Sequence, residues 1–252
     1  MTTPVSPAAV WHDVECGAYR TDLPLWSRLA AAQGDPILDV GAGTGRVALE
    51  LAGLGHDVTA LDRDGELLAE LLRRANHRRA EGGALRLRTV IADAREFELQ
   101  ERFALIAVPM QTIQLLGGAA GRDAFLRRAA GHLRRGGRVA IALTEQFELY
   151  EVSDIDLQRM PKPDVGELGG VVFRSHPTAV RTNGETIVLE RRRERISATG
   201  RRLVEAHRIS LDRLTSAQLE HEARAAGLRP SARIDIPATD DHVGSVVVVL
   251  DA

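Results

Sequence analysis

A glycine-rich turn between an apolar run and an amphipathic run constrains the fold of this chain more than any other feature. The residues from Ile37 to Val40 have the pattern of a short buried strand, and Arg46 to Ala52 have helical spacing. Between them, Gly41, Gly43 and Gly45 stand at alternate positions. Such glycines allow a tight backbone turn and let a ligand approach where a Cβ atom would clash. The pattern therefore predicts a strand–turn–helix unit with a ligand at the turn.

Strands and helices alternate over the first 143 residues. The predicted strands are residues 37–40, 58–61, 85–91, 103–108 and 138–143, and the predicted helices are residues 8–33, 46–52, 64–79 and 122–134. Proline lacks the amide hydrogen that a helix interior needs, so Pro24 is expected to break the first helix into two. Alternation at this spacing is typical of βαβ units, and it predicts an α/β fold with a parallel sheet covered on both faces.

The alternation stops after Thr144. Three later runs resemble strands with no helix between them, and Asn183-Gly184 is a strong hairpin signal between the first two. These runs are residues 171–180, 185–197 and 201–211, followed by a helix from Thr215 to near Gly227 and by strands at 234–236 and 245–250. The sequence thus predicts a three-stranded antiparallel meander, a helix and a terminal antiparallel strand pair.

We expect one domain over residues 1–252. Its expected parts are an N-terminal helical lid (1–35), a ligand-binding core (36–145), the antiparallel insert (146–212), and the final helix with the strand pair (213–252). The single cysteine, Cys16, fits a reducing compartment, and no transmembrane run or secretory signal is visible. A net charge of −2 gives no overall attraction for polyanions. These observations predict a cytoplasmic protein with no membrane or nucleic-acid partner.

Acidic residues follow three successive predicted strands. Asp39 precedes the glycine turn, Asp62 ends the second strand 21 residues after Gly41, and Asp93 follows the third. Carboxyl ends of parallel strands form the edge where such sheets bind ligands. There, Asp62 can accept hydrogen bonds from both hydroxyls of a ribose, and Asp93 can approach an adenine amino group. The dinucleotide fingerprint requires a glycine where Arg46 stands, which disfavours a nicotinamide-dependent oxidoreductase.

The acidic residue and the Gly-x-Gly-x-Gly spacing resemble motif I of class I S-adenosylmethionine-dependent methyltransferases, and residues 37–145 resemble their core. The resemblance implies a Rossmann-like, doubly wound seven-stranded sheet of order 3-2-1-4-5-7-6, with an antiparallel β insert after strand five. It implies S-adenosyl-L-methionine as the cofactor, and methionine-end contacts from Asp39 and from the backbone of Gly41, Ala42, Gly43 and Gly45. It places the ribose at Asp62 and the adenine at Asp93 and Ala94, with Arg63 and Met110 as further contacts.

The segment after the fourth strand contains neutral hydrogen-bonding side chains. Gln111, Thr112 and Gln114 follow Met110 in a loop that the topology places over the cofactor edge, so they are candidates for positioning the acceptor. The alternative is that they only cap the turn. Amino-methylating enzymes of nucleic acids and proteins resemble one another in an Asp/Asn-Pro-Pro-aromatic motif here. This chain lacks that motif, which argues against a nucleobase or glutamine amide as the acceptor.

Two residues outside the core are further candidates. Similar small-molecule enzymes cover the cofactor with an N-terminal segment, which makes Tyr19 a candidate cofactor contact, although core packing explains it equally well. His242 belongs to a loop expected at the ligand-binding edge, where a neutral imidazole can accept a proton. The alternative for His242 is a solvent-exposed loop residue, and Glu145 is an alternative base. No cluster with metal-ligand spacing is present in the sequence, so no metal is expected.

The resulting functional prediction is methyl transfer to a nitrogen or oxygen of a small-molecule acceptor, achieved mainly by positioning. A non-catalytic cofactor-binding protein of the same fold is the alternative, and a nucleotide-dependent oxidoreductase is a weaker one. Residues 190–195 mix arginines with glutamates, which favours a solvated sheet face or a dimer contact over an anion-binding patch. A homodimer through the β insert is therefore also considered.

Overall fold

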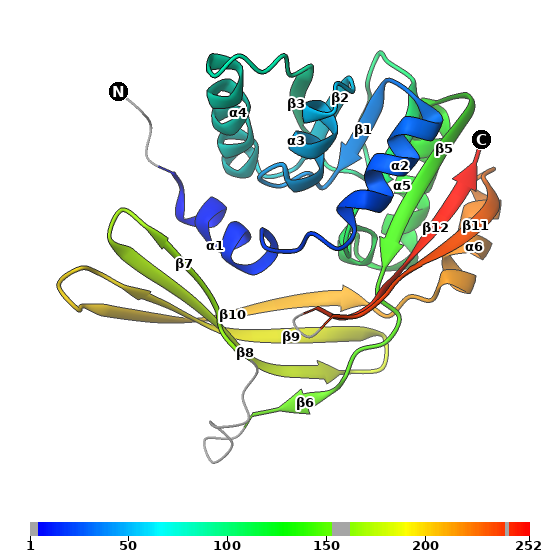
Figure 1. The fold of residues 1–252 in the computed structure, drawn as a ribbon. Helices are drawn as coiled ribbons and strands as arrows, with labels where there is room; N and C mark the ends of the chain where they lie inside the picture. The colour runs from blue at the N-terminus through cyan, green and yellow to red at the C-terminus, as the bar shows by residue number, and fades with distance from the viewer. Residues whose placement is uncertain (1–4, 153–161, 240–241) are drawn as a thin grey trace. The chain divides into compact units, whose positions relative to one another are not determined.

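The computed structural model describes residues 5–152, 162–239 and 242–252, which form two compact units (Figure 1). The first unit comprises Met1–Tyr19 and Phe147–Arg213, and the second comprises Arg20–Gln146 and Leu214–Ala252. The residues predicted as an N-terminal lid, 1–35, are thus divided between the two units after Tyr19.

A seven-stranded sheet organises the second unit. Its strands are β1 (Ile37–Val40), β2 (Val58–Asp62), β3 (Leu87–Ile91), β4 (Phe103–Val108), β5 (Leu133–Leu143), β11 (Arg229–Ile236) and β12 (Ser245–Asp251). They lie in the order β3-β2-β1-β4-β5-β12-β11, with the first five parallel and β12 antiparallel to both its neighbours. This confirms the predicted 3-2-1-4-5-7-6 order, because β11 and β12 are the sixth and seventh strands of the sheet in chain order.

Helices connect these strands. They are α2 (Leu23–Gln33), α3 (Arg46–Gly53), α4 (Gly65–Ala80), η1 (Thr112–Leu115), α5 (Gly118–His132) and α6 (Ser216–Ala225). Side chains cap the N-termini of two of these helices. Asp64 accepts from backbone amides of the first turn of α4, and Thr215 forms a capping box with Gln218 at α6. In the described part of the chain, no helix is both long and apolar enough to cross a membrane.

The N-terminal helical segment forms two short helices as predicted, but the predicted cause is wrong. Helix α1 (Pro7–Cys16) ends at Gly17, and α2 begins at Leu23 with Asp22 as its N-cap residue. Pro24 therefore lies in the first turn of α2. Proline is favoured there because its missing amide hydrogen would have no partner within the helix.

The antiparallel sheet of the first unit has more strands than predicted. It contains β6 (Tyr150–Glu151), β7 (Asp164–Leu168), β8 (Val171–Thr182), β9 (Thr186–Ile196) and β10 (Arg202–Asp212). The order is β10-β9-β8-β6, and β7 also pairs with β8. The three-stranded meander is β8-β9-β10, so the prediction of three strands is corrected to five. β7 and β8 are joined by Gly169 and Gly170, both at positive φ, and β6 and β7 are too short and polar to give an apolar pattern.

Helix α1 packs on this sheet through an aromatic and ionic contact. The Trp11 and Phe173 rings meet edge to face with their centroids 5.2 Å apart, and the Arg193 guanidinium lies 5.1 Å from the Trp11 ring centroid. Glu15 accepts from Arg193 Nε and Nη2 at 2.8 and 2.7 Å and from Ser175 Oγ at 2.7 Å. The arginines of the 190–195 run thus include one that holds the helix to its sheet.

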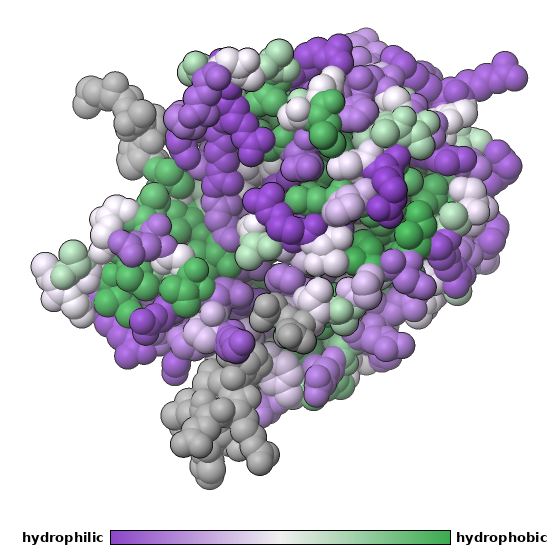
Figure 2. Space-filling model, in the orientation of Figure 1, coloured by the Kyte–Doolittle hydropathy of each residue, from purple (hydrophilic) through white to green (hydrophobic). Residues whose placement is uncertain are grey.

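Apolar side chains remain exposed near the ends of the hairpins in the first unit. Val165 and Leu168 of β7 and Leu203 and Val204 of β10 are between 42% and 58% exposed. Figure 2 shows apolar surface gathered at the end of the unit where these hairpins turn. The homodimer through the insert stays a prediction.

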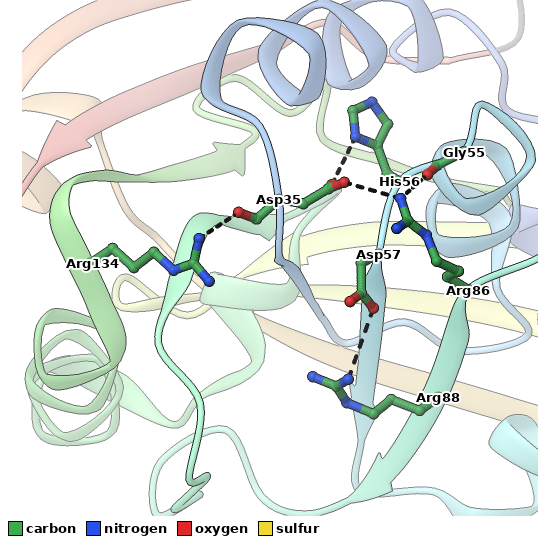
Figure 3. A network of polar contacts seen from close by, with 7 residues as sticks. All are labelled: Asp35, Gly55, His56, Asp57, Arg86, Arg88 and Arg134. Atoms are coloured by element: carbon green, nitrogen blue, oxygen red, sulfur yellow. Dashed lines mark hydrogen bonds and ion pairs between the residues drawn. The ribbon is translucent and has the colours of Figure 1, made fainter.

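Charged residues tie together the amino ends of the parallel strands, opposite the predicted ligand edge (Figure 3). The Asp35 carboxylate lies 2.9 Å from His56 Nδ1 and 3.4 Å from Arg86 Nη2, while Arg134 donates to the Asp35 carbonyl at 2.7 Å. Asp57, immediately before β2, lies 3.8 Å from Arg88. These contacts join the starts of β1, β2, β3 and β5, so the charged residues at this edge stabilise the sheet.

Candidate functional site

The glycine turn joins β1 to α3 in a conformation that requires glycine. Gly41, Gly43 and Gly45 all have positive φ, at 72°, 54° and 93°. A Cβ atom on Gly41 would lie 2.6 Å from the Thr112 side chain, and one on Gly45 would lie 2.6 Å from Leu71 Cγ. The turn is therefore packed closely between η1 and α4. The amides of Gly41 and Ala42 both donate to the Leu61 carbonyl, which fixes the turn against the end of β2.

Asp39 is buried beneath this turn without a hydrogen-bond partner. Its exposure is 1%, and within the described residues neither carboxylate oxygen accepts a hydrogen bond. Burial raises the pKa of Asp39 from 3.8 to about 7, because it outweighs the attraction of Arg46 and of the Ala48 backbone amide, and the charges of Asp62 and Asp22 add to the rise. Buried carboxyl oxygens without a hydrogen bond at normal distance can accept one from a ligand, and a positive ligand group would favour the ionised form.

Asp62 joins the glycine turn to the start of α4. Its Oδ2 accepts from the Gly43 amide at 2.8 Å, and its Oδ1 accepts from the Asp64 amide at 2.9 Å. An ionised carboxylate has about four acceptor positions, two on each oxygen. One position therefore remains on each oxygen of Asp62. This matches the two hydroxyls of a ribose, the ligand group that the sequence assigns to this residue.

Asp93 is more heavily engaged than the sequence indicated. Oδ1 accepts from the Arg95 amide and Nε, both at 2.9 Å, and Oδ2 accepts from Arg95 Nη2 at 2.6 Å. These hydrogen bonds lower the pKa of Asp93 to about 2, and Arg63 adds a smaller attraction. Arg63 itself is exposed, and Ala94 is half-buried against the core of the second unit. Both predicted cofactor contacts thus lie at the edge that carries Asp62 and Asp93.

The loop after β4 is held by its own polar side chains. The Gln114 side chain donates from Nε2 to the Thr144 backbone carbonyl at 3.0 Å and accepts at Oε1 from the Thr144 backbone amide at 2.9 Å. It thus continues the pairing of β4 with β5. Gln111 donates to Thr144 Oγ1 at 3.0 Å, and Thr112 Oγ1 donates to the Pro109 carbonyl at 2.9 Å. Met110 has a φ of 57°, which is uncommon for a residue other than glycine.

These contacts show that Gln111, Thr112 and Gln114 hold the loop in shape. Gln114 is 1% exposed and is thereby withdrawn from a ligand, whereas Met110, Gln111 and Thr112 are half-buried and can still meet one. The strained backbone at Met110 is the kind of feature that is stored at functional sites. The assignment of these side chains to acceptor positioning stays a prediction.

A buried ion pair below the turn was missed by the sequence analysis. Arg46 forms a two-pronged pair with Asp22, with Nη2 2.7 Å from Oδ2, and their side chains are 8% and 1% exposed. Trp26 Nε1 also donates to Asp22 Oδ2 at 2.8 Å. Arg46 stands where the dinucleotide fingerprint has its third glycine, and here it links α3 to α2. The two partners are 24 positions apart in the sequence, so no local pattern could indicate the pair.

His242 lies at the edge where the sequence places it. β12 runs antiparallel to β5, with Val246 opposite Leu143, so the loop before β12 adjoins the carboxyl end of β5. The His242 amide donates to Thr239 Oγ1 at 3.1 Å. Glu145, the alternative base, instead accepts from the Ser216 amide at the start of α6. Tyr19 belongs to the first unit and is buried. The roles of His242 and Tyr19 stay predictions.

The described residues contain no group of three or more His, Cys, Asp or Glu side chains that could hold a metal ion. They do contain a family signature: residues 37–137 match the model of a methyltransferase domain. No curated protein is similar enough to the chain to count as a match.

Solved structures share the fold over the whole chain. The sugar N-methyltransferase KedS8 from Streptoalloteichus sp. is 18% identical, with a TM-score of 0.71 over 99% of this chain and 94% of that protein. The amino pentose methyltransferase CalS10 from Micromonospora echinaspora is 20% identical, with a TM-score of 0.67 over 99% of both chains. An S-adenosylmethionine-dependent methyltransferase from Clostridium acetobutylicum is 14% identical, with a TM-score of 0.68 over 96% of both. Residues 37–137 therefore carry the signature of a methyltransferase domain, and the whole chain shares the fold of these methyltransferases, one of which is named for its use of S-adenosylmethionine as cofactor.

The residues of the site fit this cofactor. The ammonium group of its methionine part is a positive group of the kind that would favour the ionised form of the buried Asp39, and Asp62 retains an acceptor position for each ribose hydroxyl. When bound, the cofactor supplies a methyl group on a positively charged sulfur. Asp39 and the glycine turn would hold the methionine end, Asp62 the ribose, and Asp93 the adenine.

The raised pKa of Asp39 makes stability depend on pH. An unfolded aspartate ionises near pH 4, whereas the folded one holds its proton to about pH 7. Between these values the unfolded chain releases a proton that the folded protein keeps, so wild-type stability falls as the pH rises. The asparagine in Asp39→Asn cannot titrate, so the variant should not show this loss. From pH 5 to pH 7, the unfolding free energy of the variant minus that of wild type should therefore increase by about 2 kcal/mol. Urea unfolding at both pH values measures this, and a constant difference would show that Asp39 is ionised throughout.

Proposed function

We propose that this protein transfers the methyl group of S-adenosylmethionine to a nitrogen of a small-molecule amine, with an oxygen acceptor as the second candidate. The observation that carries the proposal is the extent of the structural likeness. The amino pentose enzyme CalS10 matches over 99% of both chains, which includes the five-stranded sheet of the first unit and not only the methyltransferase core. KedS8, named as a sugar N-methyltransferase, matches over the same share of this chain.

The loop after β4 supports a small-molecule acceptor. Its sequence, Val108-Pro-Met110-Gln111, has neither the second proline nor the aromatic residue that amino-methylating enzymes of nucleic acids and proteins share. The side chains of Gln111 and Gln114 are engaged with Thr144. The loop thus provides a fixed wall with the backbone of Met110 at its turn, which suits an acceptor held by shape.

The chemistry requires few groups from the protein. Transfer of a methyl group is an in-line displacement, so alignment of donor and acceptor supplies much of the rate. Asp39, Asp62 and the glycine turn would hold the donor end, and the rigid loop after β4 would limit the approach of the acceptor. An amine attacks only when it is neutral, so a base near the site would hold the released proton. His242 is our candidate for that base, because its loop lies at the carboxyl edge of β5.

His242→Ala should lower turnover by about 10²-fold, the low end for general-base catalysis, and leave cofactor affinity unchanged. Steady-state rates measure the first effect, and titration calorimetry with the cofactor measures the second. His221→Ala removes a histidine of α6 and serves as the matched control. A His242→Ala variant with the wild-type rate would make His242 a surface loop residue.

The proposed function is tested with a panel of acceptors and labelled S-adenosylmethionine. Each amine, amino sugars included, is paired with the analogue that carries a hydroxyl at the same position, and products are identified by mass spectrometry. Methylated amine is the expected product. If only the hydroxyl analogues are methylated, the acceptor atom is oxygen and not nitrogen. Cofactor binding without turnover of any acceptor would favour the non-catalytic alternative.

A further inference from the structure

The hydrogen bonds around Asp93 leave it with limited capacity for a ligand. Oδ1 accepts two hydrogen bonds, from the amide and Nε of Arg95, so both of its acceptor positions are used. Oδ2 accepts one, from Arg95 Nη2 at 2.6 Å, and keeps one position. The side chain is 21% exposed, so that position can be reached by a ligand. Asp93 therefore has room for a single hydrogen-bond donor.

Arg95 lies beside the start of α5. A Cβ atom on Gly121 would lie 3.4 Å from Arg95 Cδ, and one on Gly117 would lie 3.9 Å from Arg95 Nη1, both ordinary contact distances. The Arg95 side chain thus runs past these two glycines. Its guanidinium binds the carboxylate through two parallel hydrogen bonds, a geometry that fixes the plane of both groups.

From this geometry we infer that Arg95 is a positioning residue that makes the Asp93 site selective for a 6-amino purine over a 6-oxo purine. The inference rests on the proposed function, since it takes Asp93 as the adenine contact. A 6-amino group donates to the remaining position on Oδ2, whereas the oxygen of a 6-oxo purine would face a carboxylate that has no hydrogen to donate. Arg95 keeps the carboxylate oriented, so it enforces that rejection without touching the purine.

The contribution of Arg95 is orientation and not charge. An aspartate ionises near pH 4 without any partner, and the hydrogen bonds from Arg95 lower the pKa of Asp93 further, to about 2. The carboxylate is therefore an acceptor at neutral pH with or without Arg95. What the two-pronged pair adds is a fixed plane for that carboxylate, with its remaining position on Oδ2.

The test compares the affinities of S-adenosylhomocysteine and S-inosylhomocysteine, which differ at the purine 6 position, by titration calorimetry. Wild type should bind the adenosine compound about 10- to 100-fold more tightly, the range for one hydrogen bond to a charged group. Arg95→Ala should reduce this ratio to about threefold, because the freed carboxylate can turn away. Arg95→Lys, which keeps the charge without the two-pronged geometry, should give an intermediate ratio.

Arg127→Ala is the matched control, because Arg127 is also exposed and donates from Nε to an aspartate, Asp123, at 2.9 Å. This control should keep the wild-type ratio. A merely structural role for Arg95 would weaken both compounds equally and leave the ratio unchanged, and that result would overturn the inference. So would a wild-type ratio near one. The acceptor panel does not enter this measurement, so selective binding without methyl transfer would count against the proposed function alone.

Discussion

Arg46→Met is expected to lower the free energy of unfolding by about 3 to 5 kcal/mol, the range for breaking a buried ion pair from one side. The change removes both hydrogen bonds of the guanidinium to Asp22. The carboxylate is 1% exposed and would keep the hydrogen bond from the Trp26 indole. The lost attraction should also raise the pKa of Asp39 further, since Arg46 is the largest influence that opposes burial there. Urea unfolding at pH 7 measures the loss.

Two variants separate the ion pair from a general effect of removing a buried arginine. Arg122→Met breaks the two-pronged pair with Glu222, whose side chain is more exposed at 19%, so its cost should be smaller and cofactor affinity should not change. Adding Asp22→Asn to Arg46→Met removes the stranded charge and keeps an acceptor for Trp26, and it should restore part of the stability. A loss below 1 kcal/mol in Arg46→Met would show that water reaches Asp22.

The sequence predicted the core of the fold because periodicity is local. The strands β1, β2, β4 and β5 are apolar runs bounded by glycine or charge, and their alternation with helices predicts that they are parallel, whereas their order came from the family resemblance. β6 and β7 escaped prediction because Tyr150–Glu151 and Asp164–Leu168 are short and lie against one neighbour, β8. Strands of that kind are fixed by pairing with β8 and carry little signal of their own.

For the candidate site, too, some residues could be predicted from the sequence and others could not. Asp39, Asp62 and Asp93 could be found because each lies at or just after the carboxyl end of a strand, and the topology brings these ends to one edge. The partners of these residues could not be found. The Asp22–Arg46 pair joins two helices, and the two bonds between Gln114 and Thr144 span 30 residues. Arg95 lies two residues from Asp93, yet no periodic pattern assigns it to that carboxylate. Side-chain hydrogen bonds depend on rotamers and backbone turns, which periodicity does not encode.

Asp62→Ala is expected to weaken binding of S-adenosylmethionine by about 2 to 4 kcal/mol, the scale of charged hydrogen bonds lost. Both oxygens of Asp62 keep one acceptor position after binding the amides of Gly43 and Asp64, so two ribose hydroxyls can be bound at once. Asp57→Ala is the matched control, because Asp57 precedes the same strand at its opposite end (Figure 3). Calorimetry should show near-normal affinity for that variant.

Removing Asp62 also frees the Gly43 amide, so weaker binding alone does not prove a ribose contact. A cycle with 2′-deoxy and 3′-deoxy analogues of S-adenosylhomocysteine separates the two effects. If Asp62 binds both hydroxyls, each deoxy analogue should bind wild type about tenfold more weakly than the parent compound, and Asp62→Ala should bind all three about equally. If the variant still distinguishes the deoxy analogues by the wild-type factor, the hydroxyls bind elsewhere. Asp62 would then act only by holding Gly43, whose φ of 54° the turn requires for the approach of the methionine end.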